Sequence, residues 1–379
     1  MTDQFMAQDD AILDALEDIV PALLTALEAI GWAQRHLHPS HLKALEEGLA
    51  PHREKLQSAR GRLTQTEWQG DLAGLRAPLD TAAEHTLTAL AGFLDDVNDP
   101  QAMLQRFRAL RRQVGAMEAL YPLHSWLKPV SQFFLEEPVR GSEELLERIR
   151  VATVEADEDA EQGVIHYANE RDDRGGFSLY VPEYWDAAKR WPLVVALHGG
   201  SGHGRDFLWT WLREARSRGV IVLCATARDR TWSIIDPDDD IDAEPLLANV
   251  AHVMERWNVD PGKVLLTGMS DGATYAMLHG LMENVPYTHL AALSGVFHPA
   301  NMINGNIMRA AGKPIYVVHG LMDWMFPIDV AQMTRDQLTA VGAELVYREI
   351  PDLSHTYARD ENPRILCWLD SKLALPGEE

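Results

Sequence analysis

Cysteine, positive charge and long apolar runs are all scarce in this sequence of 379 residues, and each scarcity excludes a class of protein. Two cysteines do not make the disulfide framework of a small secreted domain. The formal net charge of −23 argues against nucleic acid or an anionic membrane surface as a partner. No apolar run is long enough to span a bilayer, and the first ten residues lack the pattern of a signal peptide. We therefore expect a cytoplasmic protein.

The chain is long enough for two domains, and its hydrophobic period changes once. Up to about residue 150, apolar residues such as Ile12, Leu16 and Ile19 follow a spacing of three and four, which predicts amphipathic helices. We predict a helical bundle domain over residues 1–150, with interruptions near residues 31–40, 61–71, 98–100 and 121–122. An acidic connector is predicted over residues 151–162, and a second domain over residues 163–379.

In the second domain, short apolar runs alternate with helix-compatible segments. This alternation predicts an α/β domain in which helices cover both faces of a mostly parallel sheet. In such a sheet the functional residues lie beyond the carboxyl ends of the strands. The predicted strands are residues 164–168 and 177–181, which form a hairpin, followed by 191–197, 220–225, 264–269, 290–293, 314–318 and 344–350.

The main functional motif is Gly268-x-Ser270-x-Gly272, which follows an apolar run and precedes a helical one. A strand, a sharp turn and a helix are the context in which this pentapeptide holds a nucleophilic serine in a strained conformation. Small residues are required two positions before and after the serine, and both glycines meet that requirement. The alternative is a glycine-rich turn with a solvated serine.

A serine needs a neighbouring imidazole to become a nucleophile. Asp323 and His355 both follow predicted strands, in the order Ser, Asp, His, so the three side chains are expected to meet above one edge of the sheet. His355 would accept the serine proton and Asp323 would orient the imidazole. Asp329 and Asp352 are the rival acids, but the first begins a predicted helix and the second lies too near His355 along the chain.

Two backbone N–H groups are predicted to form an oxyanion hole, those of Gly200 and Asp271. Gly200 belongs to the glycine-rich turn after the strand 191–197, and Asp271 follows the serine. A phosphate-binding loop is the alternative for this turn, but the turn lacks the Gly-Lys-Ser/Thr ending of such loops.

Together these motifs make the chain from about Gly163 onward resemble the α/β-hydrolase superfamily. Within it, the chain is similar to the phospholipase/carboxylesterase-like group, near feruloyl esterases and polyhydroxyalkanoate depolymerases. The resemblance implies a serine esterase with Ser270 as nucleophile, Asp323 as acid, His355 as base, and Gly200 and Asp271 as oxyanion donors. It implies no cofactor and no metal ion. The first 150 residues have no recognised counterpart, and the acid at position 271 replaces the residues more usual after the nucleophile, which should disfavour anionic acyl groups.

Aromatic and sulfur-containing side chains near the predicted site suggest a small-molecule ester with an apolar or aromatic group as the substrate. The preferred pocket residues are Trp232, Trp324, Met269 and Phe297. Residues 236–242 are rich in aspartate, but they lack the terminal glutamate of a calcium loop, so we expect a solvated acidic loop rather than a calcium site.

Other functions remain open at this point: an acyltransferase or a peptidase with the same triad, or a non-catalytic interaction protein acting through its helices. The helices are also predicted to support a homo-oligomer.

Overall fold

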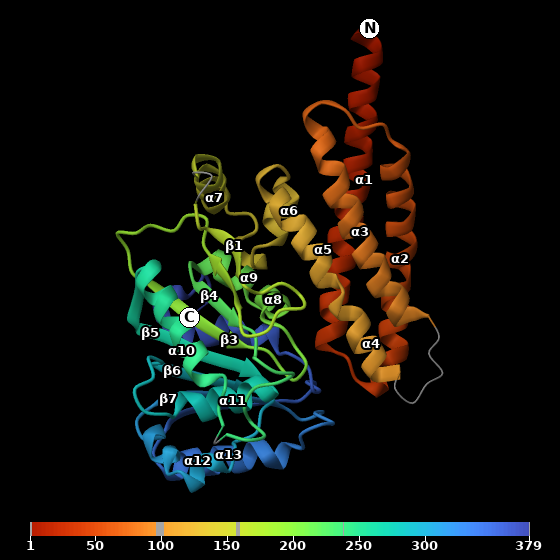
Figure 1. Cartoon of the computed structure of the whole chain (residues 1–379). Helices are drawn as coiled ribbons and strands as arrows, with labels where there is room; N and C mark the ends of the chain where they lie inside the picture. The colour runs from red at the N-terminus through yellow and green to blue at the C-terminus, as the bar shows by residue number, and fades with distance from the viewer. Residues whose placement is uncertain (1, 96–101, 157–159, 238, 379) are drawn as a thin grey trace. The chain divides into compact units, whose positions relative to one another are not determined.

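The computed structural model describes residues 2–95, 102–156, 160–237 and 239–378 and divides the chain into two compact units (Figure 1). The helical unit is Met1–Phe134, and the sheet unit is Leu135–Glu379. Within the described ranges, no helix is both long and apolar enough to cross a membrane.

The helical unit is a bundle because its helices each bury one apolar stripe. In α1, Ile12, Ile19, Leu23 and Ile30 are fully buried. The long helices lie side by side (Figure 1), and they end near the predicted interruptions, which confirms the all-helical N-terminal region. The helices are α1 (Thr2–Arg35), α2 (Leu42–Gln65), α3 (Ala73–Leu94), α4 (Ala102–Arg111), α5 (Gln113–Leu120) and α6 (Lys128–Phe133).

The sheet unit contains an eight-stranded sheet in the order β1-β2-β4-β3-β5-β6-β7-β8. Strand β2 pairs antiparallel with both β1 and β4. The remaining neighbours in this order, from β4 through β3 to β8, pair parallel. The strands are β1 (Gly163–Tyr167), β2 (Phe177–Val181), β3 (Trp191–Leu197), β4 (Ile221–Ala225), β5 (Val259–Met269), β6 (His289–Leu293), β7 (Pro314–Gly320) and β8 (Glu344–Ile350).

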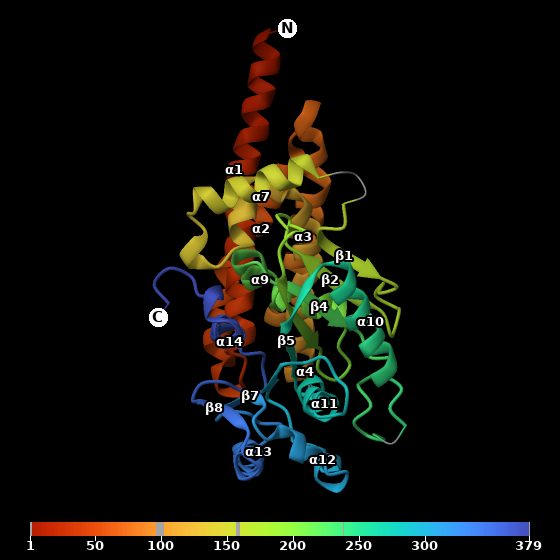
Figure 2. The same ribbon diagram turned by 90° about the vertical axis from the view of Figure 1, so that its left-hand side faces the viewer.

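Helices cover both faces of this sheet, as the sequence predicts. Figure 2 shows α9 (Leu212–Arg218) and α14 (Asn362–Leu369) on one side, with α10 (Ala243–Arg256) and α11 (Asp271–Gly280) on the other. Every residue of β3 is buried because both faces of this central strand are covered. The predicted strands are all present, although β5 begins earlier than expected, at Val259.

The boundary between the units differs from the predicted one. It lies at Phe134 and Leu135 rather than near residue 150, and α7 (Glu143–Glu155) belongs to the sheet unit. The apolar face of α7 packs in a cluster with residues near both ends of this unit, which include Leu135 and Leu375. Much of the predicted connector is therefore helix, and its residues 157–159 lie outside the described ranges.

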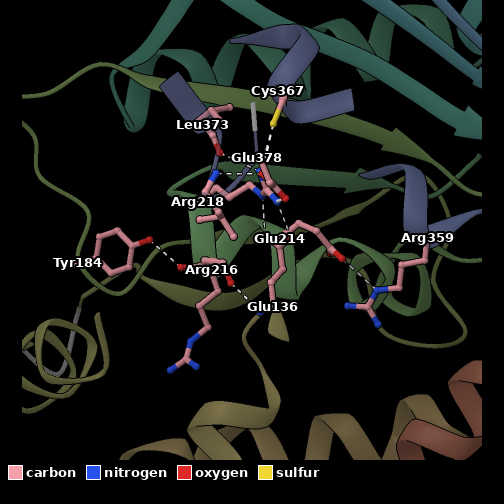
Figure 3. Close-up of polar contacts among 11 residues, drawn as sticks. Glu136, Tyr184, Glu214, Arg216, Arg218, Arg359, Cys367, Leu373 and Glu378 are labelled. Atoms are coloured by element: carbon pink, nitrogen blue, oxygen red, sulfur yellow. Dashed lines mark hydrogen bonds and ion pairs between the residues drawn. The ribbon is translucent and has the colours of Figure 1, made fainter. Parts of the chain in front are cut away.

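A buried arginine also ties the start of the sheet unit to its C-terminal segment (Figure 3). The guanidinium of Arg218 is fully buried and lies 2.7 Å from carboxylate oxygens of both Glu136 and Glu378. It also donates to the carbonyl oxygen of Leu373 at 2.9 Å. A buried charge is tolerated only where its hydrogen bonds are satisfied, and this guanidinium meets that condition. These bonds explain why residues from Leu135 onward fold with the sheet.

Candidate active site

Ser270 occupies a sharp turn between β5 and α11, with φ 56° and ψ −121°. No side chain fits at the positions two residues before and two residues after Ser270. A Cβ on Gly268 would lie 2.4 Å from the carbonyl carbon of Gly272, and one on Gly272 would lie 2.3 Å from the carbonyl oxygen of Leu197. The two glycines of the motif are therefore required by close backbone contacts, and a strained non-glycine residue of this kind is typical of functional sites.

The structure brings the three predicted triad residues into one hydrogen-bonded chain. Nε2 of His355 lies 3.0 Å from Oγ of Ser270, and Nδ1 of the same ring lies 2.8 Å from Oδ2 of Asp323. The three residues follow β5, β7 and β8, whose carboxyl ends lie at one edge of the sheet. Each is less than a tenth exposed. This is the geometry in which an imidazole accepts a serine proton while a carboxylate fixes its tautomer.

The carboxylate of Asp323 is held from two sides. Its Oδ2 faces His355, while its Oδ1 accepts the backbone N–H groups of Met325 and Phe326 at 2.9 and 2.8 Å. Burial raises the pKa of Asp323, but these hydrogen bonds outweigh burial, so that the pKa lies below its ordinary value. The rival acids Asp329 and Asp352 are both exposed. The acid therefore stays charged and oriented toward His355.

The predicted oxyanion donors lie on two segments that meet beside Ser270. A Cβ on Gly199 would lie 3.4 Å from Cβ of Ser270, which places the glycine-rich turn against the nucleophile. The structure also shows a contact that the sequence analysis did not predict. The carboxylate of Asp271 accepts a hydrogen bond from Oγ1 of Thr231 at 2.6 Å, and a Cβ on Gly200 would lie 2.5 Å from the same carboxylate oxygen. The two predicted donor residues, Gly200 and Asp271, are thus in contact with each other.

The four predicted pocket residues fall into two groups. Trp324 is 56% exposed, and its ring lies 6.2 Å from that of His355. Met269 directly precedes Ser270 and is mostly buried. Trp232 and Phe297 instead belong to the hydrophobic core. Core packing accounts for the burial of both, and a pocket role for them stays a prediction.

The indole of Trp232 has a structural contact with the glycine-rich turn. Its Nε1 donates to the carbonyl oxygen of His198 at 2.8 Å, and its ring stacks on that of Tyr275. Trp232 therefore supports the turn from within the core. The sequence could not distinguish this role from a pocket role, since a tryptophan near a strand end suits both.

Phe326 is a neighbour of the triad that lies in a loop expected from the sequence to face the site, although it is not one of the four preferred pocket residues. Its ring meets that of His355 edge to face at 5.2 Å, and its carbonyl oxygen lies 2.8 Å from Nε2 of His319. Its position three residues after Asp323, in the same loop, was the available signal. No signal in the sequence indicated Thr231.

Two aspartates of residues 236–242 have hydrogen-bonding roles that account for their position, while residue 238 of this segment lies outside the described ranges. Asp242 accepts bonds from the backbone N–H groups of Arg228 and Ser233, and Asp240 accepts one from the hydroxyl of Tyr275. Within the described ranges, no group of carboxylates, histidines or cysteines is arranged to hold a metal ion. These aspartates organise the loop that carries Thr231 and Trp232.

Comparison with known proteins gives a family match over residues 243–370, to the phospholipase/carboxylesterase model. This range contains Ser270, Asp323 and His355. The chain is 30% identical over 107 residues to an acetylxylan esterase of Coprinopsis cinerea, which covers 25% of this chain and 29% of that protein. The chain therefore spans less than a third of the length of this curated relative.

Solved structures with a similar arrangement include a thermostable esterase and the acyl-protein thioesterase 2 of Zea mays. The first has 18% sequence identity and a TM-score of 0.44, over 55% of this chain and 62% of that one. The second has 18% identity and a TM-score of 0.41, over 52% of this chain and 99% of that one. The family match and the strand order confirm the predicted α/β-hydrolase fold.

Proposed function

Because the sheet unit is an α/β-hydrolase domain of the phospholipase/carboxylesterase type, we propose that this protein is a serine hydrolase that cleaves carboxylic esters through an acyl-enzyme. One observation carries the proposal: the hydrogen-bonded chain from Ser270 through His355 to Asp323, with distances of 3.0 and 2.8 Å. A serine activated in this way attacks acyl carbons, and its strained backbone presents the hydroxyl at the end of β5.

In the proposed reaction, Oγ of Ser270 bonds to the carbonyl carbon of the ester while its proton passes to Nε2 of His355. The carbonyl oxygen becomes an oxyanion, stabilised by the backbone N–H groups of Gly200 and Asp271. His355 then gives its proton to the departing alcohol as the C–O bond breaks. Water attacks the acyl-enzyme by the same route in reverse, releasing the acid and restoring Ser270.

An apolar or aromatic substrate group suits the surface beside His355. Three apolar side chains of the loop after β7, Leu321, Trp324 and Met325, are 48%, 56% and 47% exposed. Exposed apolar side chains that adjoin a reactive group contribute binding energy by covering the apolar part of a ligand. We include Trp324 in the proposed substrate site for this reason.

The test is the Ser270→Ala variant of the full chain, assayed with p-nitrophenyl butyrate and with a fluorophosphonate label. Turnover should fall by about 10³-fold or more and labelling should disappear, while the thermal unfolding midpoint stays close to that of the wild type. Ser294→Ala is a matched control, since Ser294 also follows a strand with positive φ but contacts neither His355 nor Asp323 in the described structure. This control should keep the label. Turnover undiminished in Ser270→Ala would refute the assignment.

A further inference from the structure

The side chain of Asp271 lies between the nucleophile turn and the two loops that face it. Its carboxylate accepts the hydroxyl of Thr231 at 2.6 Å. It also fills the space where Gly200 would carry a Cβ, 2.5 Å from that position. With standard bond lengths, the carboxylate oxygen is within about 5.5 Å of the backbone nitrogen of Gly200. A negative charge thus lies close to the predicted oxyanion site.

From this geometry we infer that Asp271 selects substrates by charge: the enzyme takes esters whose acyl group is neutral or cationic and rejects those whose acyl group is anionic. An oxyanion lies about 3 Å from its backbone donors, so the acyl group attached to it comes near the carboxylate of Asp271. Like charges at this separation repel strongly in a partly buried site. The inference rests on the proposed function and names the substrate class of the same site.

No cation neutralises this carboxylate within the described ranges. The two guanidinium groups bound to the glycine-rich turn contact other atoms: Arg230 donates to Oγ of Ser201 at 2.8 Å, and Arg174 donates to the carbonyl oxygen of Gly202 at 2.8 Å. Neither forms an ion pair with Asp271. Its only side-chain partner in the described structure is the neutral hydroxyl of Thr231.

Asp271 also has a positioning role, which must be separated from its charge. The bond to Thr231 ties the nucleophile turn to the loop that carries Trp232, and Trp232 in turn holds the carbonyl of His198. Loss of this tie is expected to misplace the N–H of Gly200 and to slow all substrates alike. Loss of the charge alone is expected to change the selectivity between substrates.

The experiment uses three p-nitrophenyl esters with matched acyl length, after subtraction of their spontaneous hydrolysis. They are the neutral 5-methylhexanoate, the anionic hydrogen glutarate and the cationic 4-(trimethylammonio)butanoate. For the wild type, kcat/KM should be about 10- to 100-fold lower for the anionic ester than for the neutral one. The cationic ester should equal or exceed the neutral one, and 1 M salt should shrink the differences.

Two variants separate charge from positioning. Asp271→Asn keeps an acceptor for Thr231 but removes the charge, and it should raise the anionic-to-neutral ratio of kcat/KM by about tenfold. Thr231→Val keeps the charge but removes the hydrogen bond, and it should lower kcat for all three esters while the ratio changes by less than about twofold. Both changes keep side-chain size nearly constant.

The inference is overturned if Asp271→Asn leaves the ratio within about twofold of the wild type, or if the wild type prefers the anionic ester. The second outcome needs no variant, so it applies even if a variant does not fold. Failure of the proposed function looks different: the wild type would hydrolyse none of the esters above background, or Ser270→Ala would hydrolyse them as well as the wild type.

Discussion

The helical unit and the sheet unit differ in where their backbone is strained. Among the described residues of the helical unit, none other than glycine has a positive φ. The sheet unit has six such residues, and three of them are serines at the carboxyl ends of strands or in the turns that follow: Ser201, Ser270 and Ser294. Strained backbone persists only where the surrounding structure holds it. Within the described ranges, the strained residues other than glycine are thus confined to the sheet unit, and these three serines lie at the edge of the sheet where the proposed site lies.

The two units also differ in how they bury charge. In the helical unit, Arg60 pairs with Asp80 at 2.7 Å, but both side chains are about a third exposed. In the sheet unit, Arg216 and Arg218 are fully buried and pair with the nearly buried Glu183 and Glu136. Exposed pairs contribute little to stability, whereas breaking a buried pair is costly. The helical unit is thus held by its apolar stripes, and the sheet unit depends in addition on specific polar contacts.

The largest expected effect is a loss of activity in a variant that keeps the fold. In Asp323→Asn the amide no longer stabilises the imidazolium or fixes its tautomer, so kcat should fall by about 10⁴-fold. The matched controls are Asp329→Asn and Asp352→Asn, both at exposed positions near the site. Steady-state kinetics with p-nitrophenyl butyrate measures the difference. A comparable loss of kcat in either control would mean that the mutated residue, rather than Asp323 alone, is needed as the acid.

The sequence predicted the strands and the triad because each depends on a local pattern. Apolar runs mark the strands, and Ser270, Asp323 and His355 each come within five residues of the end of a strand. The parallel sheet then places them at one edge. The geometry of the glycine turn was also predictable, since only small residues fit beside a strained serine.

Contacts that depend on packing between distant segments were not predictable. The packing of α7 with Leu375 is one such contact, because the two lie far apart along the chain. Trp232 was assigned to the pocket because its position near a strand end says nothing of which way the ring points. The bond from Thr231 to Asp271 has no sequence signal at all. Self-association through the helical unit stays a prediction.

The second prediction compares a buried ion pair within the sheet unit with a partly exposed ion pair within the helical unit. Arg218→Met leaves the carboxylates of Glu136 and Glu378 near one another without their cation, so the free energy of unfolding of the sheet unit should fall by about 3–5 kcal/mol. Arg60→Met is the counterpart in the helical unit, and it should cost less than about 1 kcal/mol. Urea unfolding followed by tryptophan fluorescence and by far-UV circular dichroism measures both. Equal losses would contradict the distinction between the units.

The third prediction uses pH to test the same buried cluster. Hydrogen bonds from Arg218 lower the pKa of Glu378 to about 2, against the opposing effect of burial. A lowered pKa means that Glu378 stabilises the fold above its unfolded pKa, near 4.3, and that this contribution is lost as the pH falls toward 2. Because the side chain is a third exposed, we expect about 1 kcal/mol.

Glu378→Gln should therefore lower the unfolding midpoint at pH 7, and lower it only about half as much at pH 3, relative to the wild type at the same pH. Glu255→Gln, at an exposed position in α10, is the control and should have no such pH-dependent effect. Thermal unfolding between pH 7 and pH 3 measures both variants. A loss for Glu378→Gln that is the same at both pH values would show that packing, rather than charge, holds the C-terminal segment.

The smallest expected effect is a gain in the stability of the helical unit. Gly48 lies within α2, is exposed, and has no atom within 4 Å of the position of an added Cβ. Gly48→Ala should therefore stabilise the unit by about 0.4–1 kcal/mol, because alanine loses less backbone entropy on folding. Gly92→Ala is the matched change in α3, where the Cβ would lie 2.8 Å from that of Ala109 and so should destabilise. Circular dichroism melting measures the two signs. A loss of stability in both variants would mean that packing outweighs helix propensity even at Gly48, and a gain in both would mean that the close contact at Gly92 costs little.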